Sequence, residues 1–324
     1  CLSRGLGDVY KRQAYMKANY PVEYMSAVLT ADSGDTEKIS EIIHECERMG
    51  IEVLPPDINE SFAAFSVVPE SGKIRFGLTT IKNFGEGIAD AIIEERKKNG
   101  PYQSLSDFLS RVHDRNLNKK SLEALVQTGA LDRFEDRGVM YGNIDNLLSF
   151  NKAEVSAKEA SQDSLFGGGF AAVLHLDPSA EVLNKVKLTW EKELLGVYVS
   201  GHPLDEYEKE LSRPPRIPIV AIKQAVANKE EINIVRMKGG VVTAGMIETV
   251  RELLTKKGER MAFVQLADKE SQIEMTAFPE TYRALQDVLK VSNCVAVKGK
   301  LQLRNDEPTI LIDNAKLLSE DSAK

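Results

Sequence analysis

The sequence predicts a multidomain α+β protein in which a mostly helical part with a small β element precedes a five-stranded β-barrel. In residues 14–49 and 87–131, apolar side chains recur at the spacing of amphipathic helices. From about Gly239 the pattern changes to short runs of β-branched and apolar residues with one inserted helix. A chain of 324 residues is long enough for two to three domains of ~100–200 residues each.

Composition limits the possible functions. The chain carries 42 Lys and Arg against 49 Asp and Glu, a net charge of −7, which excludes a generally basic nucleic-acid coat protein. Nucleic-acid binding would therefore depend on local basic patches and backbone amides. No apolar run approaches the ~20 residues that span a bilayer, so we expect no membrane partner. The three cysteines have no short spacing, which excludes a disulfide framework and a CxxC zinc site and favours the cytoplasm.

The first 79 residues divide into two predicted segments. Residues 1–13 show neither a signal-peptide pattern nor a clean helical period, and we interpret them as a non-native scar outside the fold. Residues 14–79 predict helices followed by a small β element. Pro21 suits the first turn of one helix, and Asp35 caps another helix, which Gly50 ends.

A helix-hairpin-helix (HhH) signature comes next. Residues 81–93, IKNFGEGIADAII, predict a helix, a tight glycine hairpin and a second helix. The hairpin needs residues that tolerate positive φ and let a phosphate reach the backbone, and the following helix start offers unpaired N–H groups to it. The alternative is a packing unit of two helices and a turn without DNA contact. The candidate contacts to duplex DNA are Lys82, Asn83, Gly85 and Gly87.

Residues 80–149 as a whole predict a tandem HhH domain that binds DNA. A second helix pair follows the first unit, and Asn118 stands directly before its later helix. Lys119 and Lys120 open that helix and are further candidate phosphate contacts, although the hairpin chemistry around them is weaker.

Residues 150–182 form the predicted linker, because they are rich in Ala, Ser, Gly and Asp and have no sustained period. Within them, QDSLF has the form of a short peptide that docks in a hydrophobic pocket, with Gln162, Leu165 and Phe166 as contacts. The alternative is a Leu-Phe pair that folds back onto its own domain. Residues 183–235 then predict a helical connector.

Residues 236–318 predict a five-stranded OB-fold barrel, and 319–324 a short tail. The order is three strands, a helix that opens at Pro279, and two strands. Such barrels bind single strands on the face of the second and third strands, flanked by two loops. Buried packing is the alternative for an aromatic on these strands. The candidate contacts are Arg251, Lys256, Lys257 and Arg260 in the first loop, Phe263 on the second strand and Arg304 in the later loop.

Catalytic signatures are absent from the sequence. No P-loop, HExxH or GxSxG motif occurs, and no carboxylates form the convergent pair that two-metal phosphoryl transfer needs. We therefore predict no catalytic residue, no metal ligand and no cofactor within this chain.

Six ordered segments resemble the family of bacterial replicative polymerases, the DNA polymerase III alpha subunits. They run through nearly the whole chain from residue 14. The segments are AYMKANYPVEYMSAVLT (14–30), PPDINES (55–61), IKNFGEGIADAIIEER (81–96), LEALVQTGALD (122–132), ELLGVYVSGHPLDEY (193–207) and TKKGERMAFVQLAD (255–268).

The resemblance implies the C-terminal portion of a DNA-directed DNA polymerase: the end of the fingers, the tandem HhH domain of residues 80–149 that binds duplex DNA and the clamp, and the OB domain. It implies duplex and single-stranded DNA, a sliding clamp and other replicase subunits as partners. QDSLF stands where the family has an internal clamp-binding peptide. The family's catalytic aspartates and their Mg²⁺ would lie in a palm domain before Ala14.

Three other functions stay open. A free-standing repair or recombination module could combine HhH and OB units without catalysis. An RNA-binding barrel could be appended to a synthetase, although no synthetase motif follows it. An error-prone paralogue of the same polymerase family is the third, and the clamp peptide and complete barrel argue against it.

Overall fold

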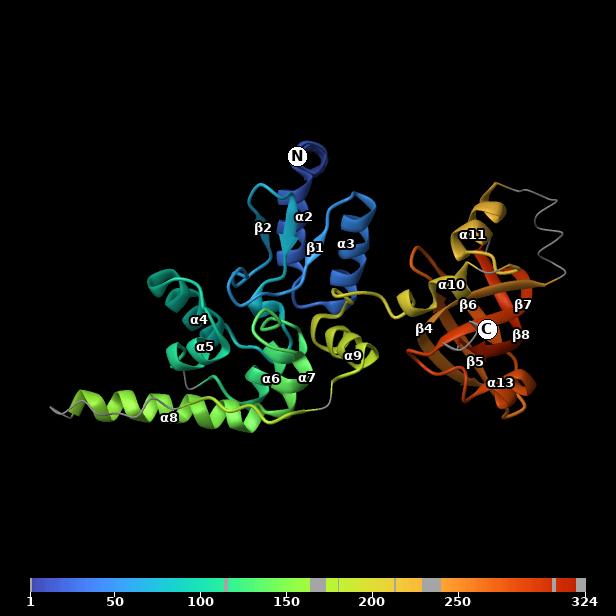
Figure 1. The fold of residues 1–324 in the computed structure, drawn as a ribbon. Helices are drawn as coiled ribbons and strands as arrows, with labels where there is room; N and C mark the ends of the chain where they lie inside the picture. Colours follow the sequence, from blue (N-terminus) through green and yellow to red (C-terminus); the bar gives the residue numbers. More distant parts are fainter. Residues whose placement is uncertain are drawn as a thin grey trace. The chain divides into compact units, whose positions relative to one another are not determined.

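The structure is a computed structural model that describes residues 2–113, 116–163, 173–179, 181–212, 214–228, 240–304 and 307–318. The chain folds into two compact units, Cys1–Ser200 and Gly201–Lys324 (Figure 1). None of the helices within the described residues is both long and apolar enough to cross a membrane.

The first unit begins with three helices and a small sheet. These elements are α1 (Leu2–Asn19), α2 (Pro21–Ala31), α3 (Thr36–Arg48), β1 (Val53–Leu54), β2 (Ser66–Val68) and β3 (Lys73–Arg75). β3 is the central strand, parallel to β1 and antiparallel to β2, and α2 and α3 contact the sheet. The predicted ends of α3 are confirmed: Asp35 Oδ1 accepts the backbone N–H of Lys38 at 3.2 Å, and Gly50 follows the helix with a φ of 73°.

α1 differs from the interpretation of residues 1–13 as a segment outside the fold. One helix runs from Leu2 to Asn19. The missing apolar period did not prevent it, because such a period is needed only where a helix face is buried. From Val9 to Asn19 every residue except Lys17 is exposed. The non-native origin of residues 1–13 stays a prediction.

Helices make up the rest of the first unit. A 3-10 turn, η1 (Leu78–Thr80), leads to α4 (Glu86–Asn99), α5 (Leu105–Arg111), α6 (Lys119–Gln127), α7 (Arg137–Gly142), α8 (Ile144–Asp163) and α9 (Asn184–Leu195). One hydrophobic core extends from Met25 to Val197. The predicted boundary between residues 79 and 80 therefore does not separate two cores, since a three-stranded sheet this short packs its apolar face on the helices.

The predicted linker and connector also differ from the structure. Residues 150–163 continue α8, because Ala, Lys and Glu favour a helix even without an apolar period. Leu174 and Leu176 then pack against the core of the first unit. α9 belongs to that unit as well, since Leu194 and Leu195 are buried in the same core.

The second unit is a closed barrel preceded by short helices. The helices are η2 (Asp205–Tyr207), α10 (Glu208–Leu211) and α11 (Ile219–Ala227). The barrel strands are β4 (Val241–Leu254), β5 (Arg260–Ala267), β6 (Gln272–Ala277), β7 (Cys294–Arg304) and β8 (Glu307–Leu317), and the helix α13 (Pro279–Leu285) lies between β6 and β7 in the chain. Its strands follow the order β4-β5-β6-β8-β7 around the barrel, which confirms the predicted OB-fold.

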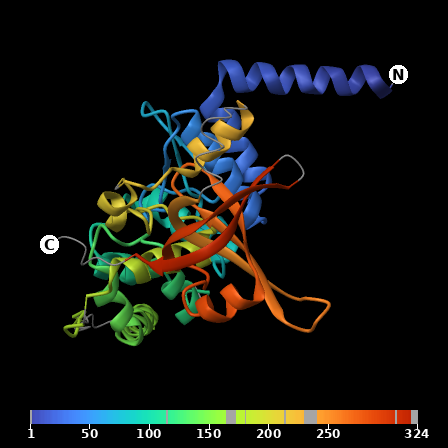
Figure 2. The same ribbon diagram turned by 90° about the vertical axis from the view of Figure 1, so that its right-hand side faces the viewer.

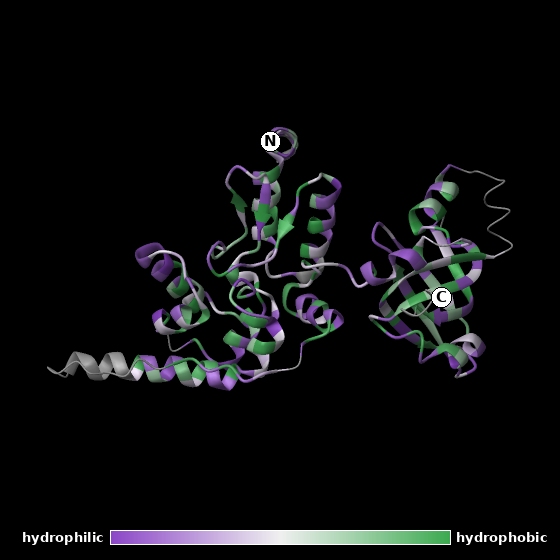
Figure 3. Cartoon of the chain, in the orientation of Figure 1, coloured by the Kyte–Doolittle hydropathy of each residue, from purple (hydrophilic) through white to green (hydrophobic). Residues whose placement is uncertain are grey.

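Alternation along the strands separates the barrel core from its outer face. In β5, Ala262, Val264 and Leu266 are buried, so Phe263 and Gln265 between them point outward. The same alternation of hydrophobic and hydrophilic residues is visible in Figure 3. The β4–β5 hairpin (orange) and the β7–β8 hairpin (red) both extend well beyond the barrel body (Figure 2). β5 is one strand of the first hairpin, and β6 lies between it and the second.

Candidate nucleic-acid interface

The first predicted DNA contact forms the turn before α4. Ile81 and Phe84 are buried, whereas Lys82, Asn83 and Gly85 are exposed. The backbone N–H of Lys82 donates to the carbonyl of Leu194 at 3.0 Å, which holds the turn against α9. The polar residues of this turn are thus exposed to solvent, while its apolar residues fix the turn to the core.

One detail of this turn corrects the prediction, and a second agrees with the tolerance for positive φ that was expected of Asn83. The helix before it is only the single turn η1, not a full helix. The left-handed residue is Asn83, with a φ of 68°, while Gly85 has a φ of −82° and Gly87 is not among the positive-φ residues. Asn tolerates this conformation, so the hairpin forms without a glycine at that position.

Gly85 leaves the start of α4 open. It is the N-cap residue, no side chain caps the helix, and a Cβ added there would meet no atom within 4 Å. The first N–H groups of α4 are therefore accessible to an anion. The negative charge of Glu86 in the first turn would weaken the binding of an anion there.

The start of α6 is less open to a phosphate than the start of α4. Asn118 and Ser121 cap this helix reciprocally, which already occupies one of its N–H groups. Lys119 Nζ lies 3.0 Å from Asp145 Oδ1 in an exposed ion pair. Lys120 is exposed. A phosphate at this helix would have to displace Asp145 from Lys119.

Three predicted contacts from separate strands meet on the outer face of the barrel. Arg251 is paired directly with Phe263 across the β4–β5 ladder, and its guanidinium carbon lies 5.5 Å from the ring centroid. Arg304, at the end of β7, places its guanidinium carbon 5.3 Å from the same ring. Both distances allow a cation–π contact. We call Arg251, Phe263 and Arg304 the arginine–phenylalanine cluster.

The prediction placed Arg251, Arg260 and Arg304 in loops, but they lie in β4, β5 and β7. Arg251 belongs to β4 rather than to a loop, because the β4–β5 ladder continues as far as the pair Leu254–Arg260. Phe263 lies outside the barrel core, so buried packing is not its role. Lys256 and Lys257 are exposed in the short turn that joins β4 to β5.

Two glutamates that the sequence analysis did not single out accompany these cations. Arg304 Nη1 lies 3.3 Å from Glu274 Oε1, and Arg260 Nη1 lies 3.5 Å from Glu252 Oε2. Glu252 Oε1 also accepts the hydroxyl of Tyr282 at 2.7 Å. Burial, together with this hydrogen bond, raises the pKa of Tyr282 to about 12. Strand alternation alone could have placed Glu274 on the outer face, but not beside Arg304.

The predicted clamp peptide cannot be placed. Gln162 lies near the end of α8, but its side chain and all of Leu165 and Phe166 are outside the described residues. Within the described residues, no group of three or more His, Cys, Asp or Glu side chains could hold a metal ion.

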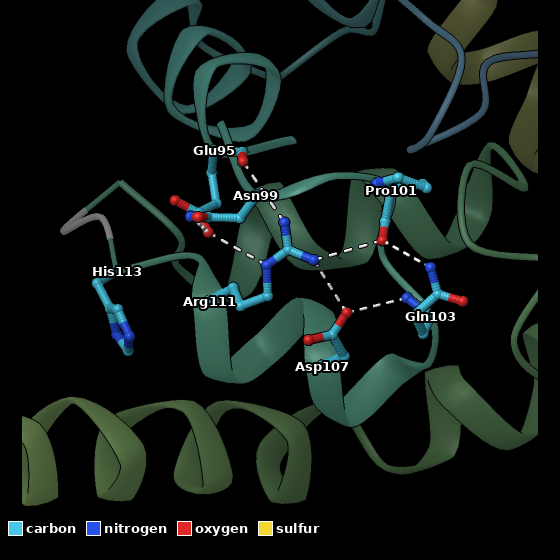
Figure 4. A pocket seen from close by; sticks show the side chains of 7 residues that line it. All are labelled: Glu95, Asn99, Pro101, Gln103, Asp107, Arg111 and His113. Atoms are coloured by element: carbon cyan, nitrogen blue, oxygen red, sulfur yellow. Dashed lines mark hydrogen bonds and ion pairs between the residues drawn. The ribbon is translucent and has the colours of Figure 1, made fainter. Parts of the chain in front are cut away.

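A pocket of about 590 Å³ between α4 and α5 is a second candidate binding site (Figure 4). Its central cation, Arg111, donates to Glu95 Oε1 at 3.1 Å, to Asp107 Oδ2 at 3.0 Å and to the carbonyl of Gly100 at 2.7 Å. Its guanidinium carbon also lies 4.5 Å from the centroid of the Tyr102 ring. Because these donors are already used, we assign Arg111 to holding α4 and α5 together and not to binding phosphate.

Two family models match the chain. A helix-hairpin-helix motif covers residues 50–139, and an OB-fold nucleic acid binding domain covers residues 241–318. The first match starts earlier than the predicted HhH domain and includes the small sheet, in agreement with the shared core.

Curated relatives cover most of the chain. DNA polymerase III subunit alpha of Borreliella burgdorferi is 36% identical over 321 residues, which cover 95% of this chain and 27% of the relative. The subunit of Pseudomonas aeruginosa is 34% identical, covering 92% and 26%, and that of Thermus aquaticus is 38% identical, covering 86% and 22%. The chain thus spans about a quarter of the length of these relatives, in their C-terminal part.

Proposed function

Because the chain belongs to the family of bacterial DNA polymerase III alpha subunits, we propose that it is the DNA-holding part of a replicative DNA-directed DNA polymerase. The whole enzyme would add deoxynucleotides to a primer 3′ end, with Mg²⁺ held in a palm domain outside these residues. The relatives favour this function over a free-standing repair module and over a synthetase. A cytoplasmic location and other replicase subunits as partners belong to the same proposal.

The arginine–phenylalanine cluster is the observation that carries the single-strand part of the proposal. An outward aromatic ring gives a surface on which a base can stack, and two guanidinium groups beside it can pair with the flanking phosphates. Lys256 and Lys257 extend this positive surface along the β4–β5 hairpin. We infer that a single template strand crosses the outer face of β4, β5 and β6.

The open start of α4 supports the duplex part of the proposal. Backbone N–H groups at Gly85 and Gly87 would bind a phosphate of the duplex, and Lys82 would add a positive charge. These contacts carry no base information, as a polymerase that copies any sequence requires.

Gly85→Asp tests this part. We expect about tenfold weaker binding of the 324-residue chain to a blunt duplex at low salt, because a carboxylate would occupy the phosphate position. Fluorescence anisotropy across a salt series measures it. Asp is a good N-cap and the site is sterically open, so the helix should stay intact.

Gly85→Asn is the matched control for the same position. Asn has the same size and capping ability as Asp but no charge, so this variant should keep most of the affinity for the duplex. Equal binding by the aspartate variant and the original chain would remove α4 from the duplex interface.

We also propose that the segment around QDSLF binds a sliding clamp, and its support is the sequence pattern alone. A peptide of modest affinity is sufficient, because DNA contacts keep the clamp at a high effective concentration. Gln162 would orient the peptide, and Leu165 and Phe166 would fill an apolar pocket.

Replacing both Leu165 and Phe166 by Ala tests this assignment. The double variant should lose clamp capture in a pulldown with the sliding clamp, because the apolar anchors would be gone. Ser164→Ala lies in the same segment without an anchor and should still be captured. Retention of the clamp by the double variant would place its binding site elsewhere.

A further inference from the structure

We propose that Glu274 limits the affinity of the barrel for single-stranded DNA by competing with phosphate for Arg304. The inference rests on the proposed single-strand role of the barrel. It assigns a tuning role to a carboxylate on the DNA-facing surface, beside the cations and the aromatic ring of the arginine–phenylalanine cluster.

The register of the strands places Glu274 on the same face as Phe263. Within β6, its neighbours Ile273 and Met275 are buried, so Glu274 points outward. It pairs with Gln265 of β5, and Gln265 is two residues from Phe263 on that strand. The carboxylate therefore stands beside the surface on which a strand stacked on Phe263 would lie.

Arg304 is shared between the ring and the carboxylate. Its guanidinium carbon lies 5.3 Å from the Phe263 centroid, while Nη1 lies 3.3 Å from Glu274 Oε1. In the free protein this guanidinium is therefore already partly neutralised. A phosphate that binds Arg304 must replace Glu274 or lie next to its negative charge.

The ion pair is weak enough to be replaced. The Arg304 side chain is 58% exposed and that of Glu274 is 38% exposed. An exposed pair of this kind contributes roughly 0–1 kcal/mol. DNA can therefore displace the carboxylate, but the lost pair and the remaining repulsion both subtract from the binding free energy.

Arg251 differs from Arg304 in this respect. It interacts with the same ring from β4, but none of the ion pairs among the described residues involves it. We infer that Arg251 is a constant part of the surface, whereas Arg304 exchanges between Glu274 and phosphate. Such an exchange suits a protein that must let each nucleotide go as it advances along a template.

Glu274→Gln tests the inference as a gain of affinity. The variant keeps the size of the side chain but cannot compete as an anion. We expect binding to a fluorescent single-stranded oligonucleotide to become about three- to tenfold tighter at low salt. The gain should shrink as salt rises, because the freed guanidinium adds one more salt-dependent phosphate contact.

Two further variants separate this effect from net charge. Glu270→Gln removes the same charge at the exposed β5–β6 turn and should leave the affinity almost unchanged. Combining Glu274→Gln with Arg304→Ala should abolish the gain, because Arg304 transmits it. An equal gain from Glu270→Gln, or a gain that persists without Arg304, would overturn the competition.

The outcomes also separate this inference from the proposed function. If the original chain does not bind single strands, the proposed function of the barrel fails together with the inference. If it binds and Phe263→Ala weakens binding, but Glu274→Gln does not strengthen it, only the competition at Arg304 is wrong.

Discussion

Phe263→Ala is expected to weaken the binding of a single-stranded oligonucleotide by about tenfold or more. The ring is the proposed stacking surface, and stacking of one base on an aromatic side chain contributes about 1–3 kcal/mol. Truncation also removes the ring that Arg251 and Arg304 flank. Fluorescence anisotropy with a labelled oligonucleotide measures the loss, and affinity for duplex DNA should stay the same.

Two controls make this result interpretable. Phe263→Tyr keeps an aromatic face and should keep most of the affinity. Phe278→Ala removes another phenylalanine of the second unit, which is 50% exposed and lies at the start of α13, outside the cluster. It should leave the affinity for the oligonucleotide unchanged. Because Phe263 is not part of the barrel core, its loss should leave thermal unfolding of the barrel nearly unchanged. Equal affinity of the alanine variant and the original chain would exclude base stacking at this position.

Glu191→Ala is expected to destabilise the first unit by about 3–5 kcal/mol, because it leaves a buried charge without one of its partners. Glu191 is completely buried, and its Oε1 lies 2.7 Å from Nη1 of Arg137, which is also buried. Its Oε2 accepts the backbone N–H groups of Val199 and Ser200 at 2.9 and 3.0 Å. The variant would lose all three interactions and leave a cavity.

Urea unfolding followed by tryptophan fluorescence measures this loss. Trp190 is the only tryptophan and is adjacent to Glu191 in α9, so its emission reports on the first unit alone. Glu193→Ala, at an exposed position of the same helix, should change the midpoint little. A loss below ~1 kcal/mol for Glu191→Ala would mean that the remaining partners of Arg137, the Asp132 carboxylate and the Gln127 carbonyl, suffice for this buried charge.

Much of the secondary structure was predictable because its causes are local. Asp35 caps α3, Gly50 ends it, and Pro21 begins α2, as the sequence indicates. The strand and helix order of the barrel was also predictable, since alternation and turn residues are read from neighbouring positions. The same local reading missed the first part of α1, residues 2–13, which carries no apolar period.

The candidate site was only partly predictable. Lys82, Phe263 and Arg304 were identified as chemically suitable residues in suitable elements. Their partners were not, because Glu274 and Arg304 are 30 positions apart in the chain. No periodic pattern connects such residues; only the packing of β6 against the β7–β8 hairpin brings them together.

The sequence by itself determined the order of the elements, the HhH and OB units and the polymerase family, all of which depend on short ordered segments. The tertiary structure alone decided that buried residues from Met25 to Val197 share one core. It also decided that Arg251 and Arg304 flank one ring while Glu274 pairs with Arg304. The physical reason is the range of the forces involved. Caps, turns and alternation act between near neighbours, whereas burial and charge pairing depend on strand register and on contacts between distant parts of the chain.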